Sequence, residues 1–151
     1  MIRHLLLIAF ALVPLGSLQA QALEQVRQQC VGGICRVVAS GGMGTGCLIS
    51  DRWVLSADHV TRLELVKVQF QTEEINVVYR VRDTQSDAVL LKLATVPKTA
   101  KPLSVARGGA RNVVMCGFDR ARTDRLRLYE GRVTDRKPTD GTIIIAPVGA
   151  R

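Results

Sequence analysis

The chain has 151 residues, of which 47% are hydrophobic, and it carries a formal net charge of +8. This apolar content excludes a disordered chain, and the many Val, Ile and Leu residues favour β-strands. The length is enough for one domain with its own core, even when an N-terminal targeting segment is set aside.

Residues 1–22 predict a secretory signal peptide. A short basic start precedes the apolar run Leu5–Leu15, and Ala20-Gln21-Ala22 has the small-residue spacing that signal peptidase reads. The alternative is a buried N-terminal helix. The apolar run is too short to span a bilayer comfortably, and no later stretch is longer. We therefore expect a secreted or periplasmic protein without stable membrane insertion after cleavage.

Short strands separated by turn residues are expected next. Alternation is clearest over Ile75–Val81, where Ile75, Val77, Tyr79 and Val81 are expected on one face. Such short strands favour an antiparallel barrel or sandwich. The six strands expected in this part are Ile34–Ala39, Thr45–Ile49, Trp53–Ser56, Leu63–Phe70, Ile75–Val81 and Ala88–Leu93.

A proline-containing stretch then predicts a linker over residues 97–110. Three further strands are expected over Asn112–Phe118, Arg127–Val133 and Thr142–Ala146. The sequence thus predicts an all-β chain in which a complete six-strand unit, at 30–96, is followed by about half of another, at 111–151.

The four cysteines, Cys30, Cys35, Cys47 and Cys116, permit disulfides if the chain is exported. Four cysteines allow three pairings, and the sequence does not choose among them. Cys30 and Cys35 could close a small loop or remain unpaired buried thiols. The cysteine spacing fits no compact zinc knuckle, so no metal is expected.

Much of the positive charge lies late in the chain. Acidic residues are interleaved with these arginines, and aromatic residues are scarce, so a solvated surface is favoured over a nucleic-acid interface. The late basic residues are Arg107, Arg111, Arg120, Arg122, Arg125, Arg127, Arg132, Arg136 and Lys137.

A glycine-rich turn leads into two strands that end at a histidine. Its residues are Gly44-Thr45-Gly46-Cys47-Leu48-Ile49-Ser50, and Trp53-Val54-Leu55-Ser56-Ala57-Asp58-His59-Val60 follows. This segment resembles the histidine region of the trypsin-like serine peptidase family. The family shows a similar glycine turn, an apolar pair and a small residue shortly before its histidine.

Two later segments resemble the same family in the same order. Ser86-Asp87 before the apolar run Ala88–Leu93 is similar to its aspartate region, and the short separation from His59 is typical of compact bacterial members. Lys101-Pro102-Leu103-Ser104 and Val113–Phe118 resemble, more weakly, the start of its second barrel. The resemblance covers Cys35 to Arg151. It implies a double-barrel fold, with a six-stranded antiparallel barrel at 30–96 followed by an incomplete second barrel at 111–151.

The resemblance implies that His59 is the general base and Asp87 the residue that orients it. A serine hydroxyl needs a base to take its proton, and a carboxylate holds that base in the right tautomer. Asp58 stands where the family usually has a small residue and is left outside this pair. Val60 replaces a cysteine common in animal members. The family implies no cofactor or metal.

The serine nucleophile is expected to be missing. Ser50 and Ser56 belong to the histidine region, Ser86 precedes the aspartate, Ser104 lies in the linker, and no serine follows. By resemblance, the nucleophile would follow the strand near Pro147, so we expect a chain truncated before it. Loss of one triad member removes about four or more orders of magnitude in rate.

The resemblance therefore implies an exported serine endopeptidase that cleaves protein or peptide substrates through an acyl-enzyme, with this chain inactive alone. The alternative is a non-catalytic peptide- or surface-binding pseudopeptidase that uses the basic segment Arg120–Arg127. A separate chain that completes the second barrel is a third possibility.

Overall fold

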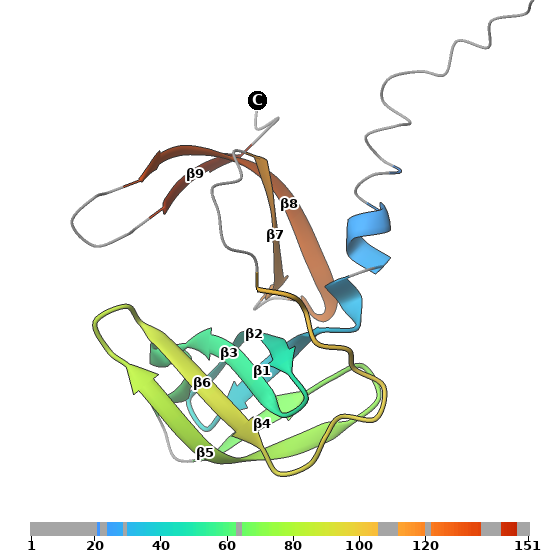
Figure 1. Cartoon of the computed structure of the whole chain (residues 1–151), viewed down its shortest axis with the longest axis vertical. Helices are drawn as coiled ribbons and strands as arrows, with labels where there is room; N and C mark the ends of the chain where they lie inside the picture. Colours follow the sequence, from blue (N-terminus) through green and yellow to red (C-terminus); the bar gives the residue numbers. More distant parts are fainter. Residues whose placement is uncertain are drawn as a thin grey trace, which may run out of the picture.

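The structure is a computed structural model that describes residues 21, 24–28, 30–62, 65–105, 112–119, 122–136 and 143–147. A short helical stretch leads into a closed barrel, and a three-stranded sheet follows it (Figure 1). The prediction of an all-β chain with a six-stranded antiparallel barrel and an incomplete second unit is confirmed. The predicted signal peptide lies, apart from Gln21, outside these residues.

The barrel closes because β4 pairs back onto β1, in the order β1-β2-β3-β6-β5-β4, with every pair antiparallel. A 3-10 turn, η1 (Asp58–Thr61), links β3 to the chain leading into β4. The strand expected over Leu63–Phe70 is shorter, and Leu65 is exposed. The strands are β1 (Ile34–Ala39), β2 (Gly42–Ser50), β3 (Trp53–Ala57), β4 (Val66–Gln69), β5 (Glu74–Asp83) and β6 (Ala88–Leu93).

Alternate residues of the strands fill the barrel with aliphatic side chains. Val37, Val54 and Leu91 are fully buried there. At Gly46, an added Cβ would lie 2.6 Å from Val54 Cγ1 and 2.9 Å from Val37 Cγ2. The core therefore needs a residue without a side chain at this point of β2.

A β-bulge in β5 changes which of its residues point toward the core. The pairing of β5 with β6 shifts between Val77 and Tyr79, and Tyr79 is exposed although Ile75 is buried. The expectation that Ile75, Val77, Tyr79 and Val81 lie on one face is therefore wrong beyond Val77. A bulge inserts an extra residue and reverses the alternation that follows.

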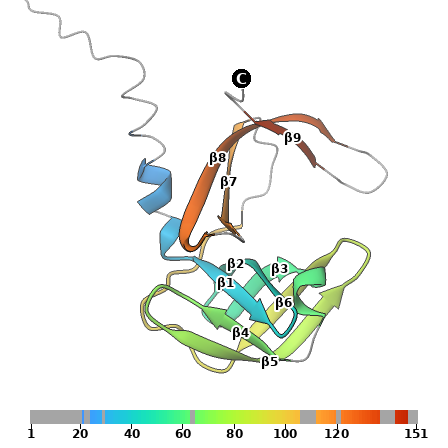
Figure 2. The same ribbon diagram turned by 180° about the vertical axis from the view of Figure 1, so that it is seen from behind.

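The second unit is the sheet β7-β8-β9, with β7 at Asn112–Asp119, β8 at Arg122–Arg136 and β9 at Ile143–Pro147. Both views show β9 away from the barrel and one end of β7 beside it (Figures 1 and 2). There the backbone N–H of Phe118 donates to Thr45 Oγ1 at 3.0 Å. The Arg36 guanidinium also lies 5.0 Å from the Phe118 ring centroid, a cation–π contact.

The chain between the two units follows the barrel surface up to residue 105. Lys101 N–H donates to Gly32 O at 3.1 Å, and Leu103 N–H donates to Leu48 O at 2.8 Å. At Gly33, an added Cβ would lie only 2.5 Å from Leu103 Cγ. The described part of the predicted linker is thus held against the barrel.

No helix within the described part of the chain is long and apolar enough to cross a membrane.

Candidate active site

Strand pairing brings the two predicted site residues together. β3 pairs with β6 so that Ala57 lies opposite Ala88. His59 follows Ala57 in η1, and Asp87 directly precedes β6. Because both residues lie at the same end of adjacent antiparallel strands, the barrel places them side by side.

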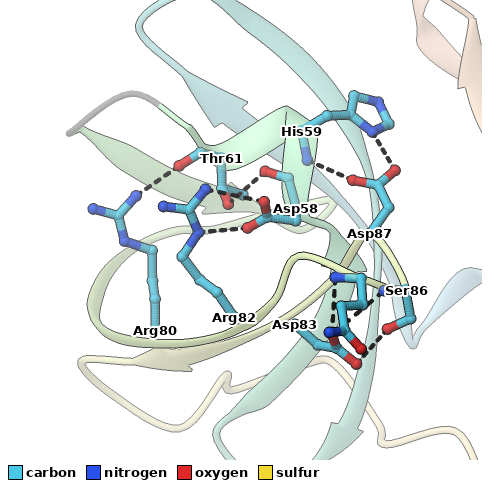
Figure 3. Close-up of polar contacts among 9 residues, drawn as sticks. Asp58, His59, Thr61, Arg80, Arg82, Asp83, Ser86 and Asp87 are labelled. Carbon is cyan, nitrogen blue, oxygen red and sulfur yellow. Dashed lines mark hydrogen bonds and ion pairs between the residues drawn. The ribbon is translucent and has the colours of Figure 1, made fainter.

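Asp87 accepts two hydrogen bonds from His59. The His59 backbone N–H donates to Oδ1 at 2.9 Å, and the ring Nδ1 lies 2.6 Å from Oδ2 (Figure 3). Both bonds lower the pKa of Asp87 below its ordinary value, and the bond from the His59 ring has the larger effect. The carboxylate is therefore the acceptor and Nδ1 carries the proton, which leaves Nε2 as the basic nitrogen.

The pair is open to solvent, because the side chains of His59 and Asp87 are 57% and 50% exposed. Asp87 also has a φ of 51°, in the left-handed region that aspartate tolerates better than most residues. The preceding turn is held by Asp83, whose carboxylate accepts from Ser86 Oγ at 2.6 Å and from Gln85 N–H at 3.0 Å. This turn presents Asp87 to η1.

The glycine-rich segment makes room for the histidine turn. An added Cβ at Gly44 would lie 2.6 Å from Val60 Cγ2, so the side chain next to His59 packs directly on the β2 backbone. The Gly44 position is therefore a packing requirement of η1.

The serine hydroxyls near the site have other partners. Ser56 Oγ donates to Thr45 O at 3.0 Å, and Ser86 Oγ donates to Asp83. Within the described ranges, no serine hydroxyl hydrogen-bonds to the His59 ring.

Asp58 lies beside the pair but faces away from it. Asp58 is 2% exposed, and its side chain forms an ion pair with Arg82 of β5. The sequence-based reading left Asp58 outside the pair and missed Arg82. A buried aspartate needs a cationic partner, but nothing in the sequence indicates that Asp58 is buried, so no sequence signal led to Arg82.

Three cysteines gather between the barrel and the second sheet. Burial raises the pKa of Cys116 to about 11, and the neighbouring Cys30 and Cys47 add to this, Cys30 also through a hydrogen bond. Burial, with Cys30 nearby, also raises the pKa of Cys47. Cys35 instead lies inside the barrel, and burial raises its pKa well above the ordinary range. All four are free thiols in this structure.

No group of three His, Cys, Asp or Glu side chains in the described ranges could hold a metal ion. A cavity of about 590 Å³ is lined by residues of β1 and β7 among others, and neither His59 nor Asp87 lines it. The cavity is lined in part by Arg27, Ile34, Arg36, Phe70, Glu73 and Phe118.

Several solved structures share this arrangement of strands. The inactive form of Rv3671c from M. tuberculosis H37Rv superposes with a TM-score of 0.66 at 18% identity, covering 85% of this chain and 66% of that one. The serine endoprotease from Yersinia pestis gives 0.65 at 16% identity, covering 83% of this chain and 53% of that one. This chain has the trypsin-like fold.

A third trypsin-like structure, kallikrein-related peptidase 10 in complex with Zn²⁺, gives a TM-score of 0.67 at 16% identity, covering 81% of this chain and 71% of that one. The present chain thus spans between about half and about seven tenths of these relatives. No protein-family model matches the sequence, and no curated protein matches it closely.

Proposed function

We propose that this chain is part of an exported trypsin-like serine endopeptidase, with His59 as the general base and Asp87 as the residue that orients it. The double hydrogen bond from His59 to Asp87 carries this proposal, because it fixes both the main chain and the ring of the histidine. The trypsin-like fold and the exposed ring of His59 support it.

In this proposal, the chemistry follows from the free Nε2 of His59. Nε2 takes the proton of a serine hydroxyl as its oxygen attacks a peptide carbonyl, and Asp87 stabilises the imidazolium that forms. His59 then gives the proton to the leaving amine, and water resolves the acyl-enzyme. The serine is expected in a segment following β9, so this chain alone is inactive.

The substrate class is a protein or peptide, and no cofactor takes part. Export rests on the signal peptide predicted over residues 1–22.

The test is labelling with a fluorophosphonate probe, which reacts with an activated serine. We expect no labelling of the 151-residue chain. DNA downstream of codon 151 should encode a Gly-Asp-Ser-Gly-Gly-like segment in some frame, and the chain extended by it should label.

His59→Ala in the extended chain should abolish this labelling, and Lys92→Met serves as a control outside the site. Labelling that survives His59→Ala would overturn the proposal. Downstream DNA without such a segment would also overturn it and would favour the pseudopeptidase alternative.

A further inference from the structure

We infer that Asp58 and Arg82 form a clamp that positions His59 against Asp87. The inference deepens the proposed function, on which it rests, by assigning a role to two residues outside the His59–Asp87 pair. The Asp58 carboxylate bonds to Arg82, and the imidazole bonds to Asp87, so Asp58 and Arg82 are positioning residues.

The clamp is a two-point contact between η1 and β5. Arg82 Nε donates to Asp58 Oδ1 at 2.5 Å, and Arg82 Nη2 donates to Oδ2 at 2.9 Å (Figure 3). Such a paired contact fixes the plane and direction of the carboxylate as well as its distance. The buried Asp58 side chain has therefore one defined orientation in the barrel end.

A second arginine of β5 holds the other end of the same turn. Arg80 Nη1 donates to the backbone oxygen of Thr61 at 2.7 Å. The Thr61 hydroxyl, itself buried, donates to the backbone oxygen of Asp58 at 3.2 Å. η1 is thus attached to β5 at both its first and its last residue, with His59 between the two attachments.

Asp58 also links this turn to the Asp87 side of the site. Its backbone N–H donates to the backbone oxygen of Asp87 at 3.0 Å, while its side chain binds Arg82. Movement of Asp58 away from β5 would therefore also disturb the alignment of His59 with the Asp87 carboxylate. The bulge after Val77 is what sets the facing of Arg80 and Arg82 in β5.

The decisive variant is Asp58→Asn in the 151-residue chain, studied by NMR. Loss of a negative charge close to Asp87, with Arg82 retained, would by itself lower the pKa of Asp87 further. Loss of the His59 hydrogen bonds would raise it toward its ordinary value. The direction of the change therefore separates positioning from simple electrostatics.

We expect the pKa of Asp87 to rise in Asp58→Asn, together with loss of the hydrogen-bonded His59 Nδ1–H resonance. Arg82→Lys keeps the charge but not the two-point contact, and it should change both signals in the same direction. The matched control is Glu74→Gln, which breaks the exposed ion pair between Lys67 and the same strand β5 and should leave both unchanged.

A pKa of Asp87 that falls or stays constant in both variants, with the Nδ1–H resonance retained, would overturn the inference. If Asp58→Asn does not fold, Arg82→Lys decides alone, because Arg82 is exposed in the folded chain. Absence of the Nδ1–H resonance in the unmodified chain would instead contradict the His59–Asp87 pair, and thus the proposed function itself.

Discussion

His59 is held by a single carboxylate that contacts its backbone and its ring together. A bond to the ring alone would leave the backbone free to move, and a bond to the backbone alone would leave the ring free to rotate. Asp87 restricts both, in a left-handed backbone conformation that few residues accept. The residue type at position 87 is therefore limited by its backbone as well as by its chemistry.

At residue 87 we predict that Asp87→Asn preserves the fold, because asparagine also accepts a left-handed backbone. The neutral amide no longer stabilises an imidazolium, and it can favour the wrong histidine tautomer. In a chain extended to include the serine, peptide hydrolysis should fall by about four orders of magnitude. Steady-state kinetics and circular dichroism measure the two effects, and loss of fold with Asn would contradict the first.

At residue 44 we predict that Gly44→Ala destabilises the barrel by about 1–3 kcal/mol, the usual range for overpacking. The new methyl group would meet Val60 beside His59, so η1 must shift. Urea unfolding measures the loss. Gly42→Ala is the control, since nothing lies within 4 Å of a Cβ at that position. Equal stability of the two variants would contradict the packing role.

At the scale of elements, the sequence predicts the His59–Asp87 pair of the site but not the contact of Arg82 with Asp58. The pairing of His59 with Asp87 could be predicted, because each residue adjoins a strand with a recognisable family pattern. The ion pair of Arg82 with Asp58 could not be predicted. The residues around Tyr79 alternate strictly in the sequence, so nothing there indicates the bulge that determines which face of β5 Arg82 lies on. The 3-10 turn and the burial of Asp58 depend on tertiary contacts for the same reason.

All four cysteines are free thiols in this structure, and three of them lie between the two units. In an oxidising compartment, we predict that Cys30 and Cys116 form a disulfide, with their two electrons and protons passing to a thiol–disulfide oxidoreductase or a small-molecule disulfide. Cys30 lies close enough to Cys116 to raise the pKa of its thiol, whereas Cys35 lies inside the barrel. A disulfide of this kind typically stabilises by about 2–4 kcal/mol.

Peptide mapping by mass spectrometry under non-reducing conditions tests this disulfide. A Cys30–Cys116 peptide should appear, and Cys116→Ser should remove it together with the gain in stability. Because its pKa is raised to about 11, Cys116 is mainly a thiol at neutral pH, and uncatalysed oxidation should accelerate as the pH rises. A dominant Cys30–Cys35 peptide would contradict the prediction.

At the scale of the whole molecule, the barrel and the sheet differ in how their strands are paired. Each barrel strand has two neighbours, whereas β7 and β9 each have one in the described sheet. Unpaired strand edges open and associate more readily than closed barrels. The barrel, which contains both His59 and Asp87, is therefore the more independent unit of this fold.

Acid should destabilise the chain in a defined range. Hydrogen bonds from Arg82, Ser86 and His59 are the largest causes that lower the pKa values of Asp58, Asp83 and Asp87 respectively. Each group contributes stability that is fully present above its unfolded pKa, about 3.9, and is lost as the pH falls through its lower folded pKa.

The melting temperature should thus be insensitive to these groups above about pH 5 and fall steeply below about pH 4. Asp83→Asn should reduce the steepness of that fall. A melting temperature that stays constant from neutral pH down to about pH 3 would contradict the assigned ionisation states.

The attachment of Lys101 and Leu103 to the barrel also limits how two copies of this chain could exchange their second sheets. Residues 104–111 span no more than about 28 Å, even when fully extended. A domain-swapped dimer would therefore need its two barrels nearly in contact, unless Lys101 and Leu103 first detach from Gly32 and Leu48. Substitution of Gly33, which would displace Leu103, is the change we expect to lengthen that reach and to favour such dimers.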